Sequence, residues 1–393
     1  MKRYNKIKLI EDFCLSENLA TYDPYDVWMG SLGIQVKQLY NKNKTLGILP
    51  AAVLTLWDTF LNNKHRISYK KKEYPTVRAL AAITLLKQYN TIKKKEYLES
   101  AERHIEWLLL NSSKGYIGLG WGLGFNWAAD DGLDYDSNTP FSTHTPYCLE
   151  AIDLYIQVTG NSNYVSHVEN IFEFFENDIQ VMFEDETSMA TSYGPQKDRL
   201  VTNSVSYALF AYSIFLKYLP GKESLLKFKI KKLYNFIASK QLNDGSWLYE
   251  PDNSSSFIDC FHSCFILKNV FKANEIIRLK GSEKIILLGY DYLKNNFYNT
   301  KHGLFKRFTL SNKPSLVKFD LYDNSEMLGI SLLLKDEELS NNLNSAIRRK
   351  FILNNNIYSI IDLFNIRRNI NMLRWAVMPY LHALASDKND ILD

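Results

Sequence analysis

Two kinds of helical segment alternate along this 393-residue chain, and the alternation limits the possible folds more than any other feature. One kind is amphipathic, with apolar residues recurring at three and four positions and Lys or Glu between them. The other kind is apolar on nearly every side and contains small residues. Because a helix that is apolar all round must be packed all round, the pattern predicts an inner ring of apolar helices inside an outer ring of charged ones.

Six inner helices are expected, and they start every 50 to 70 residues, at 77–89, 144–158, 203–218, 257–271, 319–334 and 371–385. Outer helices are expected at 95–111, 165–182, 226–241, 282–297 and 341–353. A repeat of this length indicates stacked helical hairpins. The predicted fold is therefore all-α, an (α/α)6 toroid with short hairpins at its rim. We expect residues 75–393 to form the toroid domain and residues 1–74 a helical extension packed on the ring.

Charge and cysteine content exclude several classes of protein. The 47 basic and 43 acidic side chains leave a net charge of +4, which is too even to indicate nucleic-acid binding. The basic runs at 70–72 and 93–95 are interpreted as solvated loops. The N-terminus lacks the apolar stretch of a secretory signal, and no stretch reaches the roughly 18 uninterrupted apolar residues of a membrane span. Four cysteines fit a reducing compartment, so we expect a cytoplasmic protein without membrane insertion, without a metal site and without a cofactor.

Aromatic residues make up 14% of the chain, and so many large rings must line a core or a wet cleft. The loop at 120–127 contains Trp121, Asn126 and Trp127 among several glycines, and its tryptophans are either a stacking platform for a sugar or anchors of the loop. Trp247 follows an Asp-Gly-Ser turn and is interpreted first as a structural staple. It remains a candidate for substrate binding.

Asp259 and His262 are expected to form the main catalytic pair. They are three residues apart at the start of an inner helix, so the carboxylate can orient the imidazole. His262 is then a candidate general base or acid near neutral pH. Cys260 and Cys264 lie on the same helix, but no fourth ligand has suitable spacing for zinc, and buried thiols are the simpler interpretation.

Polar side chains recur at the same end of the other inner helices. Each one alone fits a helix cap or a satisfied buried group, but their recurrence predicts a ring around one cavity. The further catalytic candidates are Tyr207, Tyr249, His144 and Asp323. The further substrate-binding candidates are Asn203, Arg78, Arg374 and Trp375. Arginines at such a cavity either neutralise aspartates or hold a carboxylate of the ligand.

Several short motifs occur in a characteristic order: Asp23-Pro24-Tyr25-Asp26, the loop 120–127, the segment 244–249, the pair Asp259 and His262, and Arg374-Trp375. Over residues 20–385 the chain resembles toroidal proteins encoded in bacterial exopolysaccharide, capsule and O-antigen assembly clusters. It is more distantly similar to glucuronyl C5-epimerases and unsaturated-glucuronyl hydrolases. The resemblance implies a six-hairpin toroid and a role in surface-polysaccharide biosynthesis. Relatives often carry Asp where this chain has Asn126, which leaves a non-catalytic role open.

Three functions follow from these observations. The first is modification of a uronic-acid glycan by C5 epimerisation, with an oligosaccharide or polysaccharide as substrate. The second is cleavage by a glycoside hydrolase or a lyase, for which hydrolysis needs two carboxylates, either Asp259 with Asp323 or Asp131 with Asp320. The third is a non-catalytic glycan-binding or assembly scaffold. The sequence does not predict the oligomeric state.

Overall fold

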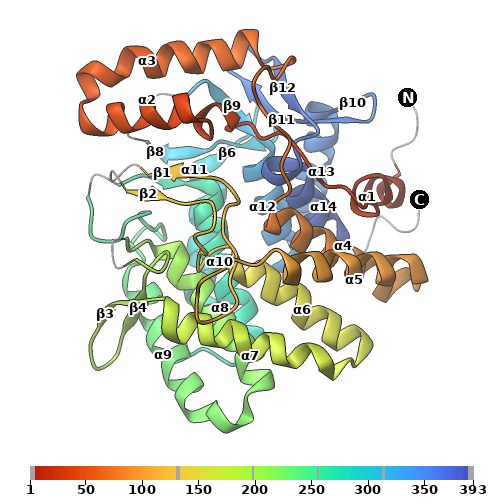
Figure 1. Ribbon diagram of the computed structural model, residues 1–393, viewed down its shortest axis with the longest axis vertical. Helices are drawn as coiled ribbons and strands as arrows, with labels where there is room; N and C mark the ends of the chain where they lie inside the picture. Colours follow the sequence, from red (N-terminus) through yellow and green to blue (C-terminus); the bar gives the residue numbers. More distant parts are fainter. Residues whose placement is uncertain (1–4, 130–132, 197–198, 255, 312–314, 388–393) are drawn as a thin grey trace.

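The computed structural model describes residues 5–129, 133–196, 199–254, 256–311 and 315–387, and it confirms the predicted toroid (Figure 1). Each inner helix contacts the next one around the ring, and the last contacts the first. The inner helices are α4 (Pro75–Ile92), α6 (Thr145–Thr159), α8 (Thr202–Tyr218), α10 (Cys260–Ile276), α12 (Leu321–Leu333) and α14 (Met378–Ala385).

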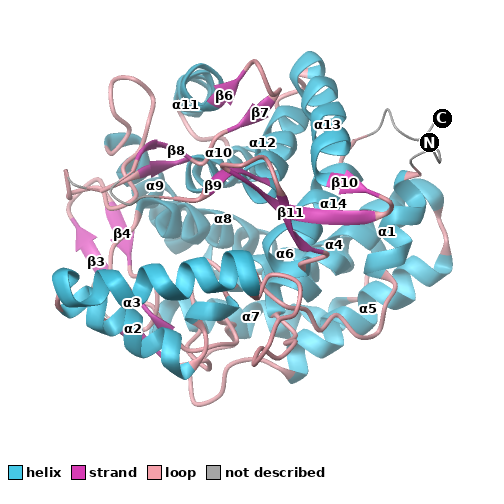
Figure 2. Ribbon diagram, turned by 90° about the horizontal axis from the view of Figure 1, so that it is seen from above, coloured by secondary structure: helices cyan, strands magenta, loops and turns pink. Residues whose placement is uncertain are grey.

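Outer helices cover this ring on the outside (Figure 2). They are α5 (Lys95–Leu110), α7 (Val165–Glu173), α9 (Glu223–Ser239), α11 (Ser282–Phe297) and α13 (Glu337–Phe351). The sixth outer position is occupied by α1 (Lys6–Cys14), which contacts both α4 and α14. The first and last parts of the chain therefore meet at one place in the ring.

The inner helices are buried on all sides, as their composition requires. In α8 every residue from Thr202 to Phe215 is buried, and small or hydroxyl-bearing residues such as Ser206 and Ser213 let neighbouring helices approach. The hydroxyls do not remain unpaired, since Ser206 and Ser213 donate to backbone carbonyls three and four residues earlier. A buried hydroxyl that is satisfied within its own helix costs little, so the apolar character of the ring is preserved.

Short strands form the rim. The two-stranded pairs are β1 (Trp127–Ala128) with β2 (Asp134–Tyr135), β3 (Val181–Glu184) with β4 (Met189–Thr191), β5 (Ile258–Asp259) with β8 (Phe308–Leu310), and β6 (Tyr298–Asn299) with β7 (Leu304–Phe305). A larger antiparallel sheet joins β9 (Val317–Asp320), β10 (Ile352–Leu353), β11 (Asn356–Asp362) and β12 (Arg367–Ile370).

This larger sheet shortens the last inner helix. The helix was expected at 371–385, but β12 ends at Ile370 and a π-helical turn, Leu373–Val377, precedes α14. Residues Asn369 and Asn371 have positive φ, which ends the strand and redirects the chain. Short hairpins are present at the rim, as expected.

The N-terminal part also contains a helical hairpin, α2 (Ser31–Lys42) and α3 (Lys44–Leu56), which continues into a π-helical turn, Trp57–Leu61. The two helices cross closely at Gly47, where a Cβ atom would lie 2.2 Å from the Cα atom of Tyr40. Helix α2 contacts β1, so the hairpin sits on the rim of the ring. The division of the chain at residue 74 stays a prediction.

Candidate functional site

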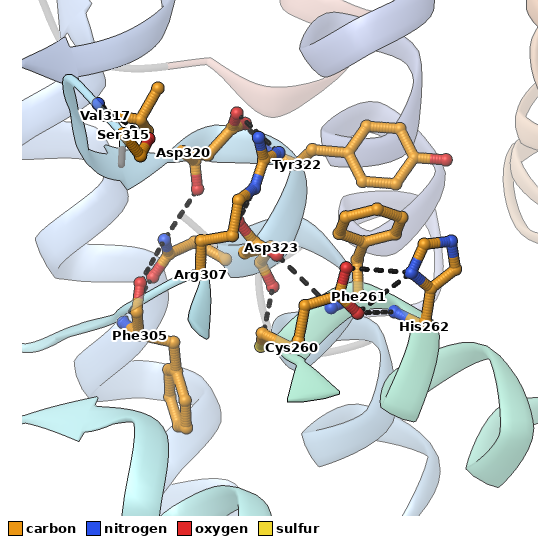
Figure 3. Close-up of polar contacts among 12 residues, drawn as sticks. Cys260, Phe261, His262, Phe305, Arg307, Ser315, Val317, Asp320, Tyr322 and Asp323 are labelled. Carbon is orange, nitrogen blue, oxygen red and sulfur yellow. Dashed lines mark hydrogen bonds and ion pairs between the residues drawn. The ribbon is translucent and has the colours of Figure 1, made fainter. Parts of the chain in front are cut away.

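Asp259 and His262 form a hydrogen-bonded pair at the start of α10. The Asp259 carboxylate caps the helix, because its Oδ1 accepts the backbone N–H of His262 at 3.1 Å. The same carboxylate lies 2.8 and 2.9 Å from Nδ1 of His262. Figure 3 shows the second ring nitrogen of His262 pointing away from this contact, and no described residue hydrogen-bonds to it. A carboxylate that holds Nδ1–H leaves Nε2 free to accept a proton.

Aromatic rings surround the imidazole of His262. The ring centroids of Phe261 and Tyr249 lie 4.0 and 4.6 Å from it, and that of Phe265 lies 5.9 Å away. A cavity of about 10 Å³, lined in part by His262 and Asn203, lies beside the imidazole and has room for about one water molecule. The buried Oδ1 of Asn203 has no hydrogen-bond partner among the described residues. Asn203 therefore offers an acceptor to whatever enters this cavity.

Arg199 connects the surroundings of His262 to a second group of aromatic rings. Its guanidinium lies over the rings of Tyr249, Tyr193 and Trp127, at 5.4, 5.6 and 5.1 Å from their centroids. Trp127 in turn stacks on Tyr135 with 5.4 Å between centroids. A cation held among aromatic faces keeps its charge while most of its surface is buried.

His144 lies beside this second group of aromatic rings, directly before α6. Its ring is 5.8 Å from Phe141, which is 5.1 Å from Tyr193. Nδ1 of His144 lies 3.1 Å from the Thr143 hydroxyl. Burial, together with the positive charge of Arg374, lowers the pKa of His144 to about 3. His144 is therefore uncharged at neutral pH and acts only as a hydrogen-bonding group.

Arg374 and Trp375 lie in the π-helical turn before α14. Nε of Arg374 donates to Asp23 at 2.6 Å, and its two terminal nitrogens have no hydrogen-bond partner among the described residues. The Trp375 indole N–H donates to Asp320 at 2.9 Å, and its ring stacks on Tyr322 with 4.5 Å between centroids. The ring of Trp375 also meets Phe261 edge-on at 5.5 Å.

These neighbours form a series at the N-terminal ends of the inner helices, the end that we call the mouth of the ring. We name the series the aromatic belt. Its members are His144, Phe141, Tyr193, Arg199, Tyr249, His262, Phe261, Trp375 and Arg374. Aromatic faces suit the apolar faces of sugar rings, and guanidinium groups suit carboxylates. The belt thus combines one oriented imidazole with two cations.

Asp323 lies beneath the belt and supports it. Its Oδ1 accepts the backbone N–H of Phe261 at 3.2 Å, and its Oδ2 accepts Nε of Arg307 at 3.2 Å. One terminal nitrogen of Arg307 donates to Asp320 at 2.9 Å (Figure 3). The other donates to the Tyr25 hydroxyl at 2.7 Å. Both carboxyl groups are fully buried, and burial raises the pKa of each. Asp323 is therefore a positioning residue rather than a group that meets a ligand.

Tyr207 lies deeper inside the ring than the belt. Its hydroxyl is 2.6 Å from that of Tyr147, and its ring is 5.5 Å from Phe265. Burial raises the pKa of Tyr207 well above its usual value, so the phenol stays protonated. A proton-transfer role for Tyr207 has no support in this geometry, because the side chain is only 2% exposed.

Two of the tryptophans that were candidates for substrate binding act as structural anchors. Trp121 is fully buried, and its indole N–H donates to the carbonyl of Leu108 at 2.7 Å. Trp247 is also buried, and its indole N–H donates to the carbonyl of Ile237 at 3.0 Å. Neither ring presents a face to a sugar, so each fits the structural interpretation rather than the substrate-binding one.

Arg78 and Asn126 also lie away from the belt. Arg78 points outward to α5, where its guanidinium lies 2.9 Å from Nδ1 of His104 and also contacts Glu73. Asn126 accepts the backbone N–H of Ser137 at 2.9 Å and thereby holds the rim loop together. Among the described residues, neither side chain hydrogen-bonds to a residue around His262, and Asp131 lies outside the described residues.

Four residues of the site were not expected from the sequence, namely Arg199, Arg307, Tyr193 and Tyr25. Tyr25 stood within one of the ordered motifs, and the others stood in polar loops that lead into inner helices. Their roles depend on contacts between distant segments, such as Tyr25 with Arg307 across 282 residues. No local spacing contains that information.

All four cysteines are buried free thiols. Cys260 lies 3.9 Å from the carbonyl oxygen of Asp323, as part of the packing between α10 and α12. Among the residues that the structure describes, no group of three His, Cys, Asp or Glu side chains is arranged to hold a metal ion.

Solved structures share this architecture, whereas no family model and no curated protein matches the chain by sequence. Cellobiose 2-epimerase from Spirochaeta thermophila aligns with a TM-score of 0.60 and 11% identity over 91% of this chain and 96% of that one. The fold is the (α/α)6 toroid. An α-mannanase of glycoside hydrolase family 76 from Bacteroides thetaiotaomicron aligns with a TM-score of 0.58 and 11% identity, over 93% and 98% of the two chains. A polysaccharide lyase aligns with a TM-score of 0.55 and 9% identity, over 91% and 97%. At such identities the likeness shows the fold alone, and the three names describe three different reactions.

Proposed function

We propose that the chain is a carbohydrate-active enzyme that epimerises a uronic-acid residue of a bacterial surface glycan at C5. The observation that carries the proposal is the Asp259–His262 pair, in which the carboxylate holds Nδ1 at 2.8 Å and Nε2 is left without a partner among the described residues. Such an imidazole is a general base whose orientation is fixed before the substrate arrives.

The proposed reaction begins with transfer of the C5 proton to Nε2 of His262. The electron pair of the broken C–H bond passes into the neighbouring carboxyl group, which becomes an enediolate. The two terminal nitrogens of Arg374 have no hydrogen-bond partner among the described residues, and Arg199 is held among aromatic rings. Both therefore supply positive charge where negative charge develops. A proton then returns to C5 from the opposite face of the sugar. Tyr249 is the belt residue proposed to deliver it, directly or through water.

The geometry gives less support to hydrolysis. Two carboxylates must flank the glycosidic bond in that reaction, and one of them must meet the leaving oxygen. Asp323 and Asp320 are fully buried and bonded to Arg307, and the side chain of Asp259 is 2% exposed and bonded to His262. An oriented imidazole suits proton abstraction beside a carboxyl group better than it suits cleavage by paired carboxylates.

Two further observations support the proposal. A protein titled cellobiose 2-epimerase shares the fold, which shows that this scaffold is compatible with stereochemical change at a sugar carbon. Four buried, unpaired thiols are compatible with a reducing compartment, and so with biosynthesis of a glycan in the cytoplasm.

The test is a proton NMR time course in D₂O with uronate-containing oligosaccharides. Loss of the C5 proton signal, with new signals of the inverted sugar and an unchanged chain length, is the expected result. New reducing ends would indicate hydrolysis, and unsaturated-sugar signals would indicate a lyase, which starts with the same proton abstraction. Line broadening without chemical change would contradict the proposal and favour a glycan-binding scaffold.

A further inference from the structure

Helix α3 presents an apolar stripe to solvent. Together with the π-helical turn that follows, it forms one helix over Lys44–Leu61, and only 11% of this helix is buried. The large apolar residues of the stripe recur at three and four positions, and their exposed fractions run from 41% to 70%. They are Leu46, Leu49, Val53, Leu56 and Phe60. Such spacing puts them on one face, and a contiguous exposed apolar face marks an interaction surface.

The apolar surface continues beyond α3 onto the turn between β11 and β12. Phe60 meets Phe364 with 6.2 Å between ring centroids, and Phe364 is 66% exposed. Leu363 and Ile366, in the same turn, are also exposed. Figure 1 shows α3 at the outer edge of the molecule, with α2 between it and β1. The stripe and the turn therefore face solvent together.

The same region has a larger net positive charge than the whole chain. Residues 31–72 contain eight basic side chains and one acidic one, a net charge of +7 against +4 for the whole chain. Exposed lysines flank the helix, with Lys42 and Lys44 at its start and Lys64 after its end. The one acidic side chain, Asp58, is buried and accepts a hydrogen bond from Tyr69 at 2.7 Å. No exposed acid in this segment opposes the lysines.

We propose that α3 docks on the surface of an anionic lipid bilayer and lies in the plane of its headgroups. An apolar stripe between lysines is typical of interfacial helices, whose affinity combines buried apolar area with attraction to anionic lipids. The helix is long and apolar enough to cross a membrane by length and composition alone, which is weak evidence for a span.

Contacts between this helix and the rest of the chain favour surface docking over crossing. The guanidinium of Arg368 donates to the carbonyl of Thr59 at 2.7 Å and lies over the ring of Phe60, 4.7 Å from its centroid. Gly47 packs against the backbone of Tyr40 on α2. A helix that crossed the bilayer would lose these contacts, whereas one that lies on the surface keeps them.

Docking would place the mouth of the ring beside the membrane. Gln38 of α2 donates to Asp134 of β2 at 2.7 Å, and Lys37 lies 5.7 Å from the ring centroid of Trp127, which neighbours Arg199. A saccharide attached to a membrane lipid would then lie close to the belt. This consequence alone rests on the proposed function, while docking itself does not.

Vesicle sedimentation with the full chain tests the proposal. Vesicles contain phosphatidylcholine alone or phosphatidylcholine mixed with phosphatidylglycerol. The test variant is Leu49→Glu with Val53→Glu, and the matched control is Leu110→Glu with Ile117→Glu, whose positions are 76% and 72% exposed away from α3. We expect the wild type and the control to bind the anionic vesicles, and the α3 variant to bind at least about tenfold more weakly. Lys44→Glu should weaken binding by roughly fivefold or more.

Three results would overturn the proposal. They are absence of wild-type binding to anionic vesicles, equal binding by the α3 variant and the wild type, and a concentration-dependent dimer that only the α3 variant abolishes, without any vesicle binding. The last result would assign the face to a second copy of the chain. Circular dichroism of all variants checks that they fold. Because vesicle binding requires no sugar chemistry, this test and the NMR test can fail separately.

Discussion

The Asp259 carboxylate makes two contacts with His262, one to the backbone N–H at 3.1 Å and one to Nδ1 of the ring at 2.8 Å. A single side chain thus begins α10 and fixes the imidazole. The two contacts have different consequences when they are changed, because the first affects the stability of the helix and the second affects proton transfer.

Asp259→Asn separates these consequences. Asparagine caps a helix about as well as aspartate, so the melting temperature should change little. The uncharged amide no longer stabilises an imidazolium, and we expect the turnover rate to fall by about 10²-fold or more. The matched control is Asp336→Asn at the N-cap of α13, where the carboxylate accepts the backbone N–H of Leu339 at 3.1 Å. Equal turnover in the two variants would contradict the assigned role of Asp259.

Arg374→Gln should raise the pKa of His144. Burial is the main reason that this pKa lies near 3, and the positive charge of Arg374 adds to the effect. Removal of a nearby cation makes protonation less unfavourable, so the pKa moves upward. An NMR titration of the His144 ring nitrogens measures the change. Arg367→Gln is the control, since that arginine donates to backbone carbonyls on the exposed side of β12. An unchanged His144 titration in Arg374→Gln would place Arg374 outside the belt.

Asp26→Asn should increase the free energy of unfolding by more at about pH 7.5 than at about pH 4. These two values lie near the two ends of the shift in the pKa of Asp26. Burial raises the pKa of Asp26 to about 7 from an ordinary value near 3.8. Between these values the folded state keeps a proton that the unfolded state has lost, so this group makes stability fall as pH rises. Asparagine does not titrate. The gain in unfolding free energy over the wild type should therefore grow across this window by on the order of 3 kcal/mol.

Urea denaturation at the two pH values measures this difference. Asp12→Asn, at an exposed position on α1, is the control and should show no such growth. A gain for Asp26→Asn that stays constant with pH would show that the carboxyl group is not held protonated.

Trp121→Phe and Trp375→Phe make the same change at an anchor and at the belt. The first removes a buried hydrogen bond to Leu108 and part of a packed ring, so it should cost about 1–3 kcal/mol of unfolding free energy without weakening glycan binding. The second replaces an indole that stacks on Tyr322 by a smaller ring and removes its N–H donor to Asp320. It should weaken glycan binding several-fold, as for a stacking aromatic. Calorimetric unfolding and titration of the same glycan measure both effects. Weaker binding in Trp121→Phe alone would reverse the assignment.

The architecture was predictable because the pattern of apolar and polar residues within each helix indicates how that helix is buried. Inner helices such as α8 have no polar face, and outer helices such as α5 have one, so the double ring follows from periodicity alone. The start of the last inner helix was not predictable, since it depends on positive φ at Asn369 and Asn371 and on a sheet formed with strands far away in the chain.

Prediction of the site was limited in the same way. The spacing of Asp259 and His262 was sufficient to place one beside the other, because both lie in one helical turn. The environments of Trp121 and Arg78 were not visible in the sequence, because a tryptophan in a glycine-rich loop points inward or outward according to its tertiary neighbours. For Trp121 that neighbour is Leu108 on α5, and for Arg78 it is His104 on the same helix.

Deuterium incorporation at C5 is the direct test of proton transfer by His262. The wild type and His262→Gln are incubated in D₂O with a uronate oligosaccharide that the NMR time course identifies as a substrate, and the recovered uronic acid is analysed by mass spectrometry. We expect one deuterium at C5 of each inverted residue with the wild type, and at least about 10²-fold slower incorporation with His262→Gln. Inversion without deuterium, or equal incorporation by both proteins, would contradict proton transfer by His262.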